Sequence, residues 1–134
     1  MSLISVPVSY GELIDKITIL EIKVAQISEP PKLANVRAEL DLLNTTWNSD
    51  DVSRLDIADA RARLKSVNED LWDIEDRIRV KEKAQAFDAE FIELARSVYF
   101  RNDERAKIKR EINVALGSQL VEEKSYKDYG AGKS

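Results

Sequence analysis

The sequence predicts an all-α protein in which two antiparallel helical hairpins, one short and one long and coiled-coil-like, form an elongated bundle. Hydrophobic residues make up 43% and charged residues 34% of the 134 positions, with only four glycines and three prolines, a composition typical of long amphipathic helices. Apolar residues also recur at alternating intervals of three and four in four separate stretches. Because 134 residues is the usual size of one domain, we expect a single helical domain over residues 1–134.

The short hairpin is expected near the N-terminus. Residues 1–8 should form an extended arm, because a proline disfavours helix at the residue before it and Pro7 ends this stretch. A first helix is expected over residues 9–28, since Ser9 and Glu12 have the spacing of a capping box. The double proline at 30–31 ends it and starts a second helix over residues 31–47. The two apolar stripes are Leu13, Ile17, Leu20, Val24 and Ile27, and Leu33, Val36, Leu40, Leu43 and Trp47.

The long hairpin is expected to follow. Ser53 and Asp56 provide cap residues for a third helix over residues 54–86, whose length would be on the order of 50 Å at 1.5 Å per residue. A turn is expected near Phe87, where the apolar pattern changes phase, and Asp88 caps a fourth helix over residues 88–116. Residues 117–134 should be a partly ordered tail. The third helix keeps a heptad spacing at Ile57, Ala60, Leu64, Val67, Leu71, Ile74 and Ile78.

Composition excludes several classes of function. The chain has neither cysteine nor histidine, which excludes thiolate catalysis and zinc–thiolate sites and removes the commonest general base. We therefore predict no metal site and no cofactor, and we expect a reducing, cytoplasmic location. No apolar run approaches the roughly 20 residues needed to cross a bilayer, so no membrane association is expected. The net charge of −4 is small and mixed in sign, which argues against nucleic acid as a partner.

One polar layer interrupts the long hairpin. The apolar stripe of the fourth helix is broken at Arg101 and Arg105. Folding the hairpin near residue 87 should place these arginines opposite Asp73 and Glu69, with Tyr99 one turn nearer the tip. The middle of the hairpin is therefore expected to hold carboxylates, guanidinium groups and a phenol.

Two interpretations of this layer stay open. In the first, it only fixes the register between two long helices, as a polar residue at an apolar seam can. In the second, the first helix lies over the layer and the charges converge on a pocket for a small polar or anionic ligand. No catalytic residue can be assigned from the sequence. The candidate ligand-binding residues are Tyr10, Glu12, Asp15, Lys16, Glu69, Asp73, Tyr99, Arg101 and Arg105.

Whole segments of the chain are similar to those of a known but uncharacterised family. They are ISVPVSYGELIDKITILEIK, LANVRAELDLLN, LWDIEDRIRVKE, FIELARSVYFRNDERAKIKREIN and VEEKSYKDY. The chain resembles a bacterial and phage-borne family described only as a domain of unknown function. The resemblance spans nearly the full length and implies a loose association with surface-polysaccharide genes, but no activity or catalytic residue.

The leading functional hypothesis is a helical interaction module that self-associates. The long hairpin cannot be covered by two shorter helices and should leave an apolar strip for another chain. The expected partner is a second copy, giving a homodimer, or another helical protein. The alternative is a small-ligand-binding protein or a small all-α enzyme that uses the mid-hairpin layer.

Overall fold

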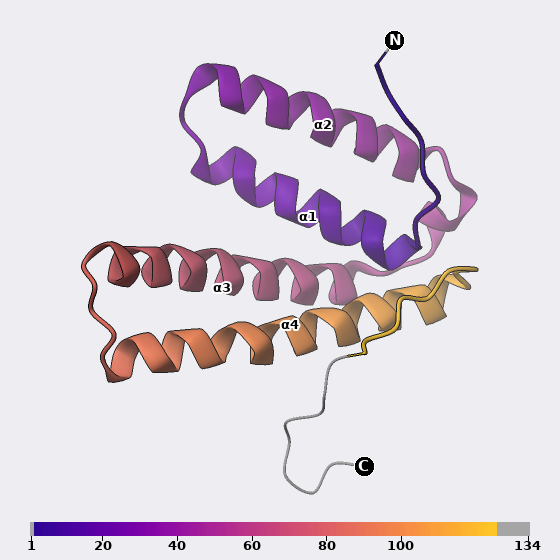
Figure 1. The fold of residues 1–134 in the computed structure, drawn as a ribbon. Coiled ribbons are helices and arrows are strands. Elements are labelled where there is room, and N and C mark those ends of the chain that lie inside the picture. Colours follow the sequence, from indigo (N-terminus) through magenta and orange to yellow (C-terminus); the bar gives the residue numbers. More distant parts are fainter. Residues whose placement is uncertain (1, 126–134) are drawn as a thin grey trace, which may run out of the picture.

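The computed structural model describes residues 2–125, and in this range it contains helices and no strand. The helices are α1 (Tyr10–Gln26), α2 (Pro30–Asn48), α3 (Ala58–Lys83) and α4 (Ala89–Leu116), with a short 3-10 helix, η1 (Asp51–Arg54), before α3. Figure 1 shows that α1 and α2 form one antiparallel hairpin and that α3 and α4 form a longer one beside it. The predicted all-α fold class is confirmed.

The start of α1 is fixed by local and long-range contacts. The Ser9 side-chain oxygen accepts a hydrogen bond from the Glu12 N–H at 3.1 Å, the cap that the sequence predicted. The Gly11 N–H donates to the Asn113 side-chain oxygen of α4 at 2.6 Å. A Cβ atom at Gly11 would overlap the backbone oxygen of Lys109, so glycine allows α1 and α4 to approach closely here.

The third helix is shorter than expected at both ends. The helix predicted over residues 54–86 begins later, at Ala58, because Asp51–Arg54 form η1 and Asp56 accepts the Ala58 N–H at 2.9 Å. It ends at Lys83, before a turn that leads to α4. Asp88 caps α4 by accepting the Phe91 N–H at 3.0 Å. Of the expected tail over residues 117–134, residues 126–134 lie outside the described part of the chain.

The apolar core lies where α1 crosses the α3–α4 hairpin. Three isoleucines (Ile14, Ile17 and Ile112) and Leu64 are completely buried there, and Trp47 joins them from α2. The α1 helix is therefore covered on both sides, by α2 and by the long hairpin, which explains its wide apolar stripe.

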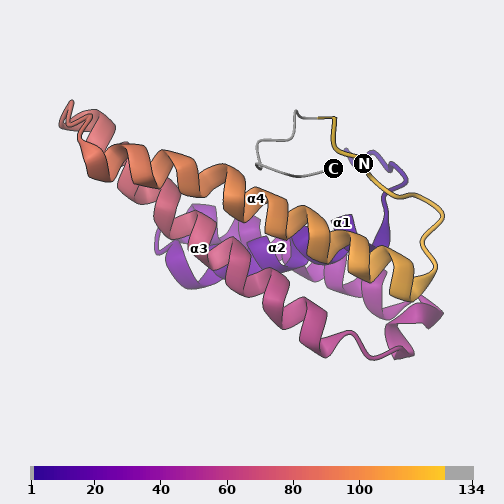
Figure 2. The same ribbon diagram turned by 90° about the horizontal axis from the view of Figure 1, so that it is seen from below.

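The long hairpin continues beyond this core. In Figure 2 its closed end projects past α1 and α2. None of the side chains in the described range 75–93 is buried, whereas Ile74 and Leu94 on either side of it are. We call residues 75–93 the outer hairpin. Among the described residues, no helix is long and apolar enough to span a membrane.

Candidate functional site

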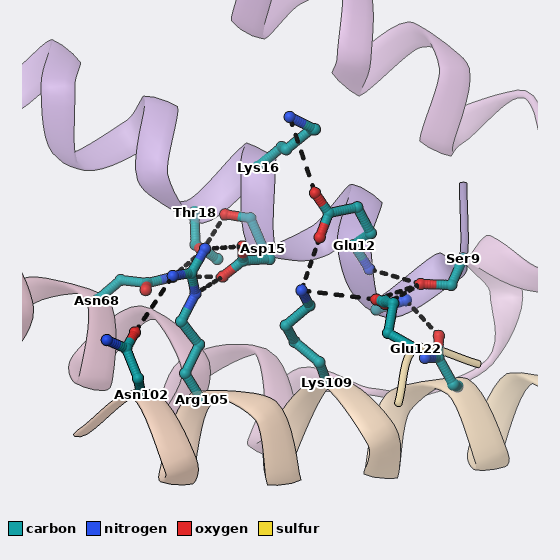
Figure 3. A network of polar contacts seen from close by, with 12 residues as sticks. Ser9, Glu12, Asp15, Lys16, Thr18, Asn68, Asn102, Arg105, Lys109 and Glu122 are labelled. Carbon is teal, nitrogen blue, oxygen red and sulfur yellow. Dashed lines mark hydrogen bonds and ion pairs between the residues drawn. The ribbon is translucent and has the colours of Figure 1, made fainter. Parts of the chain in front are cut away.

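The polar centre of the molecule is a buried carboxylate on α1. Asp15 is only 1% exposed. Arg105 on α4 binds it with two parallel hydrogen bonds, from Nε to Oδ1 at 2.9 Å and from Nη2 to Oδ2 at 2.5 Å (Figure 3). This two-point geometry is the strongest that a guanidinium and a carboxylate form. It holds α1 in one register across α4.

Side-chain amides and a hydroxyl complete the environment of this ion pair. Asn68 on α3 donates to Asp15 Oδ1 at 2.9 Å and to the Thr18 hydroxyl oxygen at 3.1 Å. Thr18 donates to the Asp15 backbone oxygen at 2.8 Å, and the Asn102 side-chain oxygen lies 3.5 Å from Arg105 Nη1. We call these five residues the Asp15 network. It joins α1, α3 and α4 at one point.

The electrostatics of the network match its geometry. Hydrogen bonding to Asp15 raises the pKa of Arg105 above its ordinary value, and the charges of Asp15 and Glu12 act in the same direction, against the effect of burial. The buried carboxylate is thus paired with a permanently charged group. Its oxygens already accept from Arg105 and Asn68, so the network is organised as a closed structural unit.

A second charged group lies beside the first, toward the start of α1 (Figure 3). Lys109 on α4 donates to Glu12 at 2.6 Å and lies 3.6 Å from a carboxylate oxygen of Glu122. Glu12 is also 3.8 Å from Lys16, and Ser9 donates to Glu122 at 2.7 Å. We call these five residues the Lys109 cluster. It links the start of α1, the end of α4 and the segment that follows α4.

Of the candidate residues from the sequence, four come together. Asp15 and Arg105 meet directly, Glu12 lies one turn before Asp15 on α1, and Lys16 directly follows Asp15 and pairs with Glu12. The expected partner of Arg105 across the long hairpin was Glu69, which instead is exposed on α3. The reason is that α1 crosses close enough to supply a buried carboxylate, which attracts the guanidinium more strongly than a solvated one.

The remaining candidates lie elsewhere. Tyr10 is near Asp50, with 3.3 Å between its hydroxyl and a carboxylate oxygen. Tyr99 is on the exposed side of α4, 3.5 Å from Arg96. Burial, followed by the charge and hydrogen bond of Asp50, raises the pKa of Tyr10 above its ordinary value. These two phenols are therefore not part of the central network.

Arg101 and Asp73 line an open groove between α3 and α4. The groove has a volume of about 540 Å³. Arg101 lies 3.4 Å from Asp70, and Asp73 lies 3.7 Å from Arg77. Each of the two helices contributes two carboxylates and one guanidinium group to its walls. No group of acidic residues in the described part of the chain is arranged to hold a metal ion.

Several residues of these networks were not identified from the sequence. Asn68 is buried next to Val67 of the heptad stripe, and a polar residue at the edge of such a stripe is a usable signal. Lys109 and Glu122 carried no comparable signal, because charged residues surround both of them in the sequence. Their pairing depends on where the chain turns after α4.

The fold and these networks define a small all-α protein with a closed buried ion pair and a projecting helical hairpin. A family model described as "Family of unknown function (DUF6165)" matches residues 4–132, and the chain belongs to this family. The expected membership of a family of unknown function is thus confirmed. No curated protein and no solved structure gave a significant match.

Proposed function

We propose that this protein is a helical interaction module that self-associates through the outer hairpin. The observation that supports this proposal most strongly is that the outer hairpin extends past the α1–α2 layer and exposes large apolar side chains. Val80 is 69%, Phe87 52% and Ile92 57% exposed. Large exposed apolar residues on a projecting element favour a protein interface, because their burial is the main source of association energy.

The closed character of the Asp15 network supports an interface over an internal catalytic site. The Asp15 carboxylate accepts three hydrogen bonds from Arg105 and Asn68, and Arg105 makes both of its strong contacts to Asp15. A substrate would have to break this pair to use either group. The network is better explained as the device that holds α1 on the long hairpin, so that the outer hairpin is presented in a fixed direction.

The charges on the outer hairpin also favour association. Arg77 pairs with Glu90 at 3.0 Å, and Lys81 pairs with both Asp88 and Glu90 at 2.8 Å. These contacts neutralise charge within one copy, which lowers the repulsion between two copies. A pair of copies related by a two-fold axis would bring the same apolar residues together from both sides.

The test is the molar mass of the full chain as a function of concentration, measured by sedimentation equilibrium. We expect the wild-type mass to rise toward that of a dimer, and Ile92→Glu to remain monomeric because it places a charge in the apolar contact. Ala115→Glu, an exposed position at the other end of α4, is the matched control and should behave as wild type. A wild-type mass that stays monomeric at every concentration would remove the proposal.

A second candidate function, binding of a small polar ligand, is favoured by one observation in the groove between α3 and α4. The Arg101 Nε atom is buried and, although it lies 3.4 Å from an Asp70 carboxylate oxygen, makes no hydrogen bond with the described residues. The groove volume of about 540 Å³ is in the range of ligand pockets. A thermal-shift screen against polar metabolites tests it: Arg101→Ala should abolish any shift. Arg79→Ala, whose side chain is 73% exposed and bridges to Glu75 on α3, should keep it.

A further inference from the structure

The segment after α4 crosses the start of α1. Figure 1 shows it, in yellow, returning along α4. We call residues 118–124 the strap. Its apolar residues are only partly buried, since Leu120 is 45% and Val121 39% exposed. The strap also makes polar contacts, which are weakened by solvent and salt.

Glu122 makes the central contact of the strap. Its carboxylate accepts a hydrogen bond from the Ser9 hydroxyl at 2.7 Å and lies 3.6 Å from the Lys109 ammonium group. Lys109 is 17% exposed, so this cation is largely shielded from water. A carboxylate of the chain itself thus occupies a position between a hydroxyl donor and a shielded cation.

A small cavity lies beneath the strap. Its volume is about 150 Å³, and its walls are Lys109, Arg110 and Asn113 of α4 and residues 122–124 of the strap. Arg110 faces the strap and donates to Glu123 at 3.0 Å. The α4 side of this cavity is therefore basic and the strap side mostly acidic.

Displacement of the strap would free the donors that it now engages, of which Lys109 and Arg110 line the cavity and Ser9 shares the Glu122 carboxylate with Lys109. The Ser9 hydroxyl would lose Glu122, and the Tyr10 N–H would lose the Ser118 side-chain oxygen at 3.4 Å. Lys109 and Arg110 would lose their strap carboxylates. Glu12 would remain on Lys109 at 2.6 Å and reduce the positive charge without cancelling both cations.

We infer that the space under the strap is a binding site for a phosphate group, which the strap closes by placing the Glu122 carboxylate where the phosphate would bind. Two basic side chains, a hydroxyl and a backbone N–H are donors that suit phosphate oxygens. A phosphate monoester carries about −1.5 to −2 charge at pH 7, more than one carboxylate, which favours exchange of Glu122 for the ligand. This site is separate from the outer hairpin and does not depend on self-association.

The test is a titration of the full chain with inorganic phosphate at constant ionic strength, followed by the amide NMR signals of Tyr10 and Gly11. Glu122→Gln removes the competing carboxylate but keeps the size of the side chain. We expect it to bind phosphate about twofold to fivefold more tightly than wild type, the range expected when a weak competing ion pair is lost. Glu111→Gln changes the net charge equally, outside the cavity, and should bind as wild type does.

A second pair of variants separates a specific site from general attraction of anions. Adding Lys109→Ala to Glu122→Gln should abolish the saturable shifts, whereas adding Lys107→Ala, an exposed lysine of α4 outside the cavity, should retain them. Circular dichroism of each variant establishes that it is folded. Absence of saturable shifts in folded Glu122→Gln, or equal shifts after Lys109→Ala, would overturn the inference.

Discussion

The inner part of the long hairpin (residues 58–74 and 94–116) and the outer hairpin both form arginine–carboxylate pairs, but these pairs differ in their burial. In the inner part, Arg105 meets a carboxylate that is 1% exposed, beside a core that includes Leu64 and Ile112. In the outer part, Arg77 and Glu90 form a pair in which both side chains are 52% exposed. The comparison shows that burial, more than residue type, decides which contacts hold the fold and which surface stays exposed.

The largest effect should come from the core. Leu64→Ala should lower the free energy of unfolding by about 2–5 kcal/mol, because a completely buried leucine leaves a cavity when it is truncated. Val80→Ala in the outer hairpin should change it by less than about 0.5 kcal/mol. Urea unfolding followed by circular dichroism measures both. Similar losses at the two positions would contradict the division into inner and outer parts.

The second-largest loss of unfolding free energy should come from breaking the buried Asp15–Arg105 ion pair. Asp15→Ala leaves Arg105 without its partner and should cost about 2–3 kcal/mol, less than for a completely buried pair because Arg105 is 31% exposed. Arg77→Ala, which breaks an exposed pair, should cost about 0–1 kcal/mol. Chemical denaturation of the single variants and of Asp15→Ala/Arg105→Ala gives the coupling energy. A coupling near zero would mean that the Asp15 network does not hold α1 in place.

The end of the outer hairpin should respond to acid. Hydrogen bonding to Lys81 lowers the pKa of Asp88 below its ordinary value of 3.8 and that of Glu90 below 4.5. Depressed folded-state pKa values stabilise the fold above those ordinary values, and this contribution is lost as the pH falls through the folded-state values. Thermal midpoints between pH 2 and 7 should therefore depend less on pH in Lys81→Ala than in wild type. Parallel curves for the two proteins would exclude this contribution.

The smallest expected effect is a change in the pKa of the Tyr10 side chain. Because burial and then Asp50 raise the pKa of Tyr10, this residue should ionise at higher pH than an unperturbed tyrosine. Asp50→Asn should lower the pKa of Tyr10 toward its ordinary value, which the absorbance of the phenolate near 295 nm would report. An unchanged titration curve would show that Asp50 does not act on Tyr10.

Much of the fold could be predicted because apolar spacing and helix caps depend on residues close together in the sequence. The heptad residues Leu64, Val67 and Ile74 are buried as their spacing indicated. Ser9 and Asp88 cap their helices as their positions before apolar stretches suggested. Such signals involve neighbouring residues, so they need no knowledge of how the helices pack.

The candidate site was harder to predict from the sequence, because its contacts join residues far apart in the chain. Asp15 and Arg105 were both candidates, but the pairing of Arg105 with Asp15 depends on the angle at which α1 crosses the long hairpin. The start of α3 was missed for a different, local reason, since Asp50 accepts the Val52 N–H at 3.0 Å and directs the chain into η1 first. Packing angles depend on tertiary contacts and short turns on local hydrogen bonds, and apolar periodicity contains neither.

Hydrogen–deuterium exchange at low and high protein concentration tests the division between a structural interior and an interacting outer hairpin most directly. Self-association through the outer hairpin predicts that peptides covering residues 75–93 become more protected as concentration rises, while peptides around Asp15 and Arg105 are equally protected at both concentrations. Protection that does not change anywhere, or that changes only in the inner part of the hairpin, would contradict it.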